Sequence, residues 1–306
     1  MDGDERRRAL AELSEQWVAT TDGRQLRAVV AGTGTDLVVL EAGLGAAALT
    51  WGPVMEHLAP HCRVVAYDRA GYGRSDPGPG ARDLSRLADD LLAVVGAVDH
   101  SRLVLAGHSW GGPLARLAAA RLMEEATGSL RDGPDARHGA ARRSLTGLVL
   151  VDPADEHAEL YFSRAMRVQR ALQGPMLQVL ARGGLLRPLL HAQGAALPEP
   201  YRSCAAGDAS TLTAARTMVA ENAHVIRGLR SLRLDPLDLG AVPLTVVSGC
   251  LAGGGDRTVR EQLIQAHSAS AGAHPGGRHV RAWRSGHLVP FTEPDLVADE
   301  ILALLA

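Results

Sequence analysis

The sequence contains no lysine, so all 32 of its basic residues are arginines. This absence excludes lysine Schiff-base chemistry and the lysine-containing phosphate loop. Cysteine is also scarce, at three residues that are far apart: Cys62, Cys204 and Cys250. An odd number of widely spaced cysteines indicates neither a disulfide framework nor a zinc cluster.

The sequence also lacks a large excess of charge of either sign, and it lacks long apolar runs. The formal net charge is -2, which gives no electrostatic reason to expect nucleic acid or a membrane as a partner. No apolar run reaches the roughly 18 residues of a spanning helix. The first residues, Met1-Asp2-Gly3-Asp4-Glu5-Arg6, do not resemble a signal peptide, so we expect a cytoplasmic location.

Short apolar runs recur along the chain and alternate with helical patterns. This alternation is typical of an α/β fold with buried, mostly parallel strands and crossover helices. An Asp22-Gly23 turn between two further strand patterns predicts an antiparallel hairpin near the N-terminus, after a short helix over residues 5–16. The apolar runs are 37–40, 64–67, 103–106, 148–151, 244–247 and 279–283, and the helical patterns are 51–58, 84–98, 113–125, 259–270 and 295–305.

Two stretches interrupt the alternation. Residues 127–144 are polar and rich in Gly and Arg, which predicts a long loop. Residues 155–239 contain no strand pattern, and prolines, among them Pro175, divide them into short helical pieces. We therefore expect a core domain formed by 1–154 and 240–306, with 155–239 as a helical cap over the carboxyl ends of the strands.

The segment Gly107-His108-Ser109-Trp110-Gly111 follows an apolar run and precedes a helical pattern. In that context G-x-S-x-G predicts a nucleophile elbow, in which a tight strand-to-helix turn projects the Ser109 hydroxyl above the sheet. The flanking glycines are needed because the backbone bends back on itself. The start of the following helix adds positive partial charge where an oxyanion would form.

With these segments the chain resembles the α/β-hydrolase superfamily. Further motifs that carry the resemblance are Glu41-Ala42-Gly43-Leu44-Gly45, the run from Tyr67 to Ser75 (YDRAGYGRS) and Ser285-Gly286-His287. The resemblance implies a Ser-acid-His order along the chain and a helical cap. It also implies that Ser109, rather than the aspartate of relatives that act on epoxides or haloalkanes, is the nucleophile.

A serine hydroxyl needs a neighbouring base, and the base needs an acid to hold its tautomer. His287, after the last predicted strand, is the expected base. Asp256, in the glycine-rich loop after the penultimate strand, is the expected acid, because the superfamily most often places its acid there. Asp152, in Val151-Asp152-Pro153, is the alternative acid.

The oxyanion hole needs two converging backbone amides. The resemblance assigns them to Leu44 and Trp110, although Ala42 stands where relatives commonly have histidine. Glu41 ends a buried strand and needs a partner, for which an ion pair with Arg69 or a hydrogen bond to nearby backbone is the hypothesis, and a second acid at the site is the functional alternative. Apolar residues of the insertion either line an acyl pocket or serve in ordinary packing: Met166, Met176, Leu177, Leu185 and Leu186.

Together these observations predict an esterase-like serine hydrolase that needs no cofactor and acts on a small-molecule substrate, as a monomer or a homodimer. Hydrolysis of C–C bonds, lactones or thioesters and cofactor-free perhydrolysis, as in haloperoxidase-like members, use the same triad and remain alternatives. A non-catalytic binding module on the same fold is the alternative of a different class.

Overall fold

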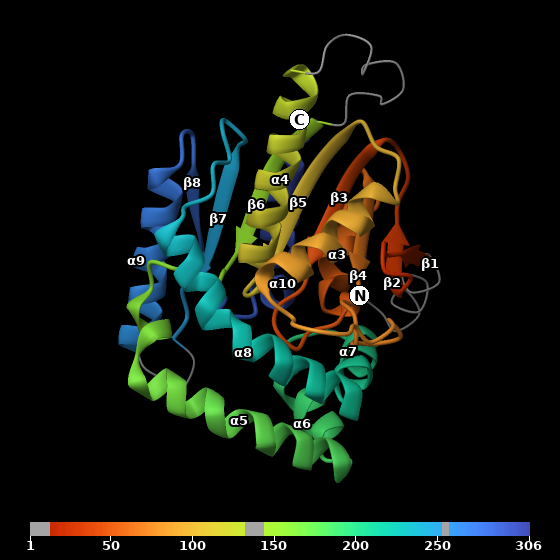
Figure 1. The fold of residues 1–306 in the computed structure, drawn as a ribbon, viewed down its shortest axis with the longest axis vertical. Helices are drawn as coiled ribbons and strands as arrows, with labels where there is room; N and C mark the ends of the chain where they lie inside the picture. Colours follow the sequence, from red (N-terminus) through yellow and green to blue (C-terminus); the bar gives the residue numbers. More distant parts are fainter. Residues whose placement is uncertain (1–12, 132–143, 253–256) are drawn as a thin grey trace.

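A computed structural model describes residues 13–131, 144–252 and 257–306, with side chains left undescribed in 127–131 (Figure 1). At its centre lies an eight-stranded sheet in the order β1-β2-β4-β3-β5-β6-β7-β8. The strands are β1 (Ser14–Ala19), β2 (Gln25–Ala31), β3 (Asp36–Glu41), β4 (Arg63–Tyr67), β5 (Arg102–His108), β6 (Ser144–Val151), β7 (Leu244–Gly249) and β8 (Arg278–Ala282).

The sheet is mixed in the way that the sequence predicts. β1 and β2 form the antiparallel hairpin, β2 pairs antiparallel with β4, and all other neighbours are parallel. All six apolar runs form strands, although β8 ends at Ala282, one residue before the end of the predicted run 279–283. The short helix expected over residues 5–16 is wrong at its described end, because Ser14 to Gln16 belong to β1.

Helices cover both faces of the sheet, which explains why its central strands are continuously apolar. One set of alternate strand residues, such as Val38 and Val104, packs with the inner faces of α2 and α11. The other set, such as Val39 and Leu105, packs with α3 and α4. The described helices outside the insertion are η1 (Ala48–Trp51), α2 (Gly52–Leu58), α3 (Leu84–Gly96), α4 (Gly111–Arg131), α9 (Arg257–Ala273), α10 (Val289–Thr292) and α11 (Pro294–Leu302).

Between β6 and β7 the described chain is helical. Figure 1 shows these helices together beyond one end of the sheet, with α5 outermost. They are η3 (Glu159–Phe162), α5 (Arg164–Arg182), α6 (Leu186–Gln193), α7 (Tyr201–Ala209) and α8 (Leu212–Leu234). The prediction that Pro175 divides this region is wrong, because Pro175 lies inside α5.

The loop predicted over 127–144 is partly wrong. α4 continues to Arg131 and β6 begins at Ser144, and residues 132–143 lie outside the described part of the chain. Within that part, none of the helices combines the length and the apolar character that crossing a bilayer requires.

Candidate active site

Ser109 lies in the turn between β5 and α4. Its φ is 53°, and Asp152, at the end of β6, has a φ of 41°. These are the two non-glycine residues with positive φ in the described ranges. Non-glycine residues rarely adopt this conformation, and it concentrates at functional sites.

The register of the sheet brings these two residues together. β5 and β6 are neighbouring parallel strands in which His108 pairs with Val151. Ser109 and Asp152 are the next residues along each strand, so they leave the same edge of the sheet side by side. The amide of Ser109 donates to the carbonyl oxygen of Val151 at 3.0 Å, which fixes the turn against β6.

The glycines around Ser109 are required by close backbone contacts. A Cβ on Gly107 would lie 2.3 Å from the carbonyl oxygen of Gly111, and a Cβ on Gly111 would lie 2.4 Å from that of Glu41. Separations below about 3 Å exist only if the backbone shifts. The two glycines therefore allow the tight strand-to-helix turn on which the G-x-S-x-G prediction depends.

His287 follows β8 and meets Asp152. Its Nδ1 lies 2.7 Å from Oδ2 of Asp152. The Asp152 side chain is almost fully buried, whereas that of His287 is 47% exposed. A neutral imidazole bonded to a carboxylate through Nδ1–H presents its Nε2 as a proton acceptor. The pair therefore has the contact expected between the acid and the base of a triad.

Asp152 is held from several sides. Oδ1 accepts from the Gly249 amide at 3.0 Å and from Arg260 Nη1 at 2.6 Å. Burial alone would raise the pKa of Asp152, but the hydrogen bond and charge of His287, the charge of His267 and the bond from Arg260 hold it below its usual value. The carboxylate is therefore ionised over the ordinary pH range and fixed in place.

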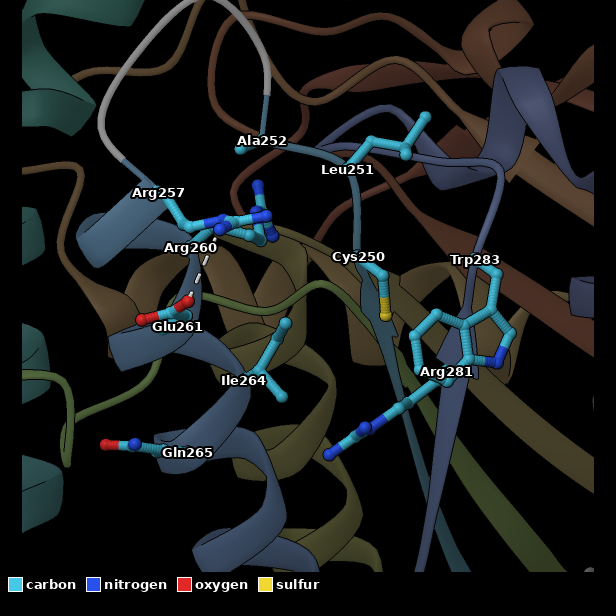
Figure 2. A pocket seen from close by; sticks show the side chains of 10 residues that line it. All are labelled: Cys250, Leu251, Ala252, Arg257, Arg260, Glu261, Ile264, Gln265, Arg281 and Trp283. Carbon is cyan, nitrogen blue, oxygen red and sulfur yellow. Dashed lines mark ion pairs between the residues drawn. The ribbon is translucent and has the colours of Figure 1, made fainter.

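Asp256, the other candidate acid, lies outside the described residues, so its place relative to His287 stays a prediction. Figure 2 shows a hollow whose lining includes Ala252 and Arg257, the described residues on either side of 253–256. Its volume is about 560 Å³, and Arg260 lies between it and Asp152. The described residues that line it are Cys250, Leu251, Ala252, Arg257, Arg260, Glu261, Ile264, Gln265, Arg281 and Trp283. They include neither Ser109 nor His287, so we do not assign the substrate to this hollow.

His108 connects the turn of the nucleophile to the loop of the base. Its Nε2 donates to the backbone carbonyl oxygen of His287 at 2.8 Å, and the two imidazole rings lie 4.8 Å apart. Burial, together with the neighbouring His287, lowers the pKa of His108 to about 3. His108 is therefore a neutral positioning residue that orients the His287 loop.

The turn after β3 runs directly beside Ser109. A Cβ on Gly43 would lie 3.2 Å from the Cβ of Ser109. Leu44, the next residue, packs in the apolar cluster that contains Trp110. No described residue accepts a hydrogen bond from the backbone amide of Leu44 or Trp110.

A buried charge cluster supports that turn. The Arg69 guanidinium donates to Glu41 and to the carbonyl oxygen of Ala42, both at 2.6 Å, and to that of Gly43 at 2.7 Å. It also pairs with Glu221 of α8 at 3.0 Å. The expected partnership of Glu41 and Arg69 is thus present. The cluster ties α8 to the backbone just before Leu44.

Some residues of this site have no sequence signal of their own. Glu221 is fully buried and is bonded by Arg69 and Arg82, yet it lies in the middle of a long amphipathic pattern. His267 in α9 is also buried, bonds Ser248 and the carbonyl oxygen of Pro153, and lies 4.0 Å from Asp152. Neither residue is part of a motif, so only the tertiary structure identifies them.

One group of side chains has the spacing of a metal site. Ligand atoms of Asp155, Glu156 and His157 lie within 4.8 Å of one another. However, both carboxylate oxygens of Glu156 accept from Arg116 at 2.8 Å, and Asp155 accepts from Ser270 at 2.6 Å. These contacts explain the group as a structural network, and we assign no ion to it.

Comparison with known proteins identifies the family of this chain. The sequence profile described as "Alpha/beta hydrolase family" matches residues 37–300. The protein named "Putative carbamate hydrolase RutD" from Azorhizobium caulinodans is 40% identical over 81 residues, which is 26% of this chain and 30% of that protein. The "Putative non-heme haloperoxidase" of Mycobacterium phage D29 is 31% identical over 126 residues, which is 38% of this chain and 45% of that protein. Each match therefore spans less than half of the relative's length.

Among solved structures, a thermophilic esterase from Thermogutta terrifontis superimposes with a TM-score of 0.64. The comparison covers 95% of this chain and 98% of that one, at 21% sequence identity. At this identity the likeness concerns the fold alone.

Proposed function

Because the chain belongs to the alpha/beta hydrolase family, we propose that it is a serine hydrolase that cleaves a small to medium, apolar carboxylic ester through an acyl-enzyme. The observation that carries the proposal is the 2.7 Å contact between His287 and Asp152. It occurs at the same sheet edge as Ser109, whose positive φ is typical of a nucleophile elbow.

In the proposed first step, the Ser109 hydroxyl attacks the substrate carbonyl carbon as Nε2 of His287 takes its proton. Asp152 stabilises the resulting imidazolium and stays ionised itself. The buried position of Asp152 and its bond from Gly249 support this role, because they keep the carboxylate in one orientation. We therefore assign the acid to Asp152, the second of the two sequence candidates.

The tetrahedral intermediate carries a negative charge on the former carbonyl oxygen. We assign its stabilisation to the backbone amides of Leu44 and Trp110, whose freedom from described acceptors supports the assignment. The protonated His287 then gives its proton to the leaving alcohol, which breaks the C–O bond and leaves the acyl group on Ser109. In the second half, His287 activates a water molecule that releases the acid and restores Ser109.

We further propose that the helical insertion, residues 155–239, is a cap that sets substrate choice. α8 packs against the residues that surround the nucleophile: a Cβ on Gly228 would lie 2.9 Å from the Trp110 ring, and one on Gly45 would lie 2.8 Å from Sδ of Met218. A substrate over Ser109 would therefore contact α8.

Carbamate hydrolysis is a second candidate, because a relative carries that name. A carbamate carbonyl would be attacked by Ser109 in the same way, and the bond that breaks would differ. Perhydrolysis is a third outcome with the same triad, and its support is the haloperoxidase name of the phage relative.

The test is a panel of p-nitrophenyl esters of increasing acyl length, assayed beside lactones, thioesters and carbamates with wild-type protein and with Ser109→Ala. The proposal expects turnover of at least one short or medium ester that Ser109→Ala lowers by about 10³-fold or more. Equal rates for the two proteins, or no turnover of any acyl substrate, would refute it and favour a binding module.

A further inference from the structure

The outer helices of the insertion expose a large apolar surface. The α5–α6 apolar surface consists of Val168, Leu172, Met176, Val179, Leu185 and Leu189, which are 38% to 69% exposed. Large apolar side chains scattered singly are normal on a protein surface, whereas a continuous row indicates an interaction site. The sequence leaves open whether Met176 and Leu185 line an acyl pocket, and their exposure shows that they face outward instead.

The row follows from the geometry of α5. Its residues 168, 172, 176 and 179 are spaced by three or four positions, so they lie on one face of the helix. The opposite face packs on α8, where Leu177 joins a cluster with Ala215 and where a Cβ on Gly174 would lie 3.2 Å from Val219. Figure 1 shows α5 along the outer edge of the insertion, with α8 between it and the sheet.

The charge along α5 and α6 is mostly positive, and the carboxylate that lies against them is that of Glu199, 2.8 Å from Nε2 of His191 in α6. From residue 160 to 198 the sequence contains five arginines and neither aspartate nor glutamate. Four of these arginines are exposed: Arg164, Arg167, Arg182 and Arg187. Arg164 is one turn before Val168 and Arg182 is three residues after Val179, so both lie beside the apolar row.

An exposed apolar row rimmed by arginines on an amphipathic helix is the pattern of a helix that lies in a membrane interface. We infer that α5 and α6 dock this protein onto the surface of an anionic phospholipid bilayer. The apolar side chains enter the acyl boundary, and the exposed arginines pair with lipid phosphates.

A second copy of the chain fits this surface less well. A two-fold interface would place the same patch on both sides, so the arginines of α5 would face each other, and α5 itself has no acidic residue to pair with them. The anionic bilayer satisfies both the apolar and the charged component. The near-neutral charge of the whole chain does not argue against it, because the positive charge of α5 and α6 is local.

The experiment measures flotation of the full chain with two kinds of vesicle. One consists of phosphatidylcholine alone, and in the other about a third of the lipid is phosphatidylglycerol. We expect binding to the anionic vesicles at least tenfold stronger than to the neutral ones, and weaker binding as salt rises. The triple change Val168→Ser, Leu172→Ser and Val179→Ser should abolish it. Replacing Arg164 with Gln should weaken it by about fivefold.

Two controls keep the test independent of catalysis and of folding. Leu234→Ser alters an exposed leucine outside this surface and should bind like wild type. Ser109→Ala should also bind like wild type, whatever its activity.

Several outcomes would overturn the inference. They are the absence of vesicle binding, equal binding to both vesicle types, and a triple variant that binds like wild type. A dimer in light scattering that the triple variant dissociates, without vesicle binding, would assign the surface to a second copy instead.

Discussion

Nδ1 of His287 lies 2.7 Å from Oδ2 of Asp152, although 135 positions separate the two residues in the sequence. The contact is possible because β7 alone separates β6 from β8 in the sheet, so the loop after β8 has one strand to pass before it reaches Asp152 at the end of β6. That loop passes close to β7, since a Cβ on Gly249 would lie 1.8 Å from the Gly286 carbonyl oxygen.

The first prediction separates the two candidate acids. Asp152→Asn should lower kcat for a reactive ester by about 10³- to 10⁴-fold, because the amide cannot hold the imidazole in the tautomer that accepts the Ser109 proton. The matched variant Asp256→Asn should retain kcat within about threefold. Steady-state kinetics of both variants, with circular dichroism to check folding, makes the comparison. A large loss in Asp256→Asn alone would return the acid to the loop after β7.

The two acids show where sequence reasoning is sufficient and where it is not. Strand runs, the hairpin and the nucleophile turn follow from local patterns, because each depends on residues close in sequence. The choice between Asp152 and Asp256 depends on which loop the His287 ring meets, and that is a tertiary property. The prediction that Pro175 divides the insertion is wrong for a related reason. Packing of α5 on α8 stabilises a helix that proline alone would interrupt.

Glu221 and His267 could not have been predicted as parts of the site. Each lies in a helical pattern whose inner face is otherwise apolar or small, and each is satisfied by partners from distant segments. One weak signal was present for Asp152: an aspartate directly after a buried strand and directly before proline. Such a residue is held out of the helical conformation, and it leaves the sheet at the edge where Ser109 lies.

A second prediction concerns stability in acid. The pKa of His108 is about 3 in the folded protein, against about 6.5 in an unfolded chain. Between these values the unfolded chain binds a proton that the folded protein does not. The free energy of unfolding therefore falls as pH falls through this window, by up to about 1.4 kcal/mol per unit from this group.

His108→Gln should remove that contribution while leaving an amide that can donate to the His287 carbonyl oxygen. The free energy of unfolding is measured with urea at about pH 7, 6 and 5. Between these pH values it should decrease less in the variant than in the wild-type protein. Parallel curves for the two proteins would contradict the neutral, buried role of His108.

The third prediction tests the buried charge cluster. Burial alone would raise the pKa of Glu221, but the charges of Arg69 and Arg82 hold it below its usual value. Glu221→Gln would leave two buried guanidinium groups with too little negative charge, and it should cost about 3–5 kcal/mol. Glu261→Gln is the matched control, since its carboxylate is exposed and 4.0 Å from Arg257, and it should change stability by less than about 0.5 kcal/mol. Similar decreases in the free energy of unfolding of the two variants, measured by chemical denaturation, would contradict a stabilising role of the cluster.

The fourth prediction tests the nucleophile turn through two glycines. Gly107→Ala should prevent the native turn, because its Cβ would lie 2.3 Å from the Gly111 carbonyl oxygen. Gly272→Ala meets nothing within 4 Å in α9 and should stabilise the protein by about 0.5–1 kcal/mol. Thermal unfolding measures the stability of both variants. A Gly107→Ala protein with wild-type stability and activity would refute the turn geometry.

The most direct test of the whole account is covalent labelling by a fluorophosphonate probe, followed by mass spectrometry of the digested protein. The account predicts one adduct, on Ser109, that disappears in Ser109→Ala and forms far more slowly in His287→Ala and in Asp152→Asn, while Asp256→Asn is labelled at the wild-type rate. A probe that leaves Ser109 unmodified in folded wild-type protein, or that labels it equally fast without His287, would contradict the assignment of this site as a serine hydrolase.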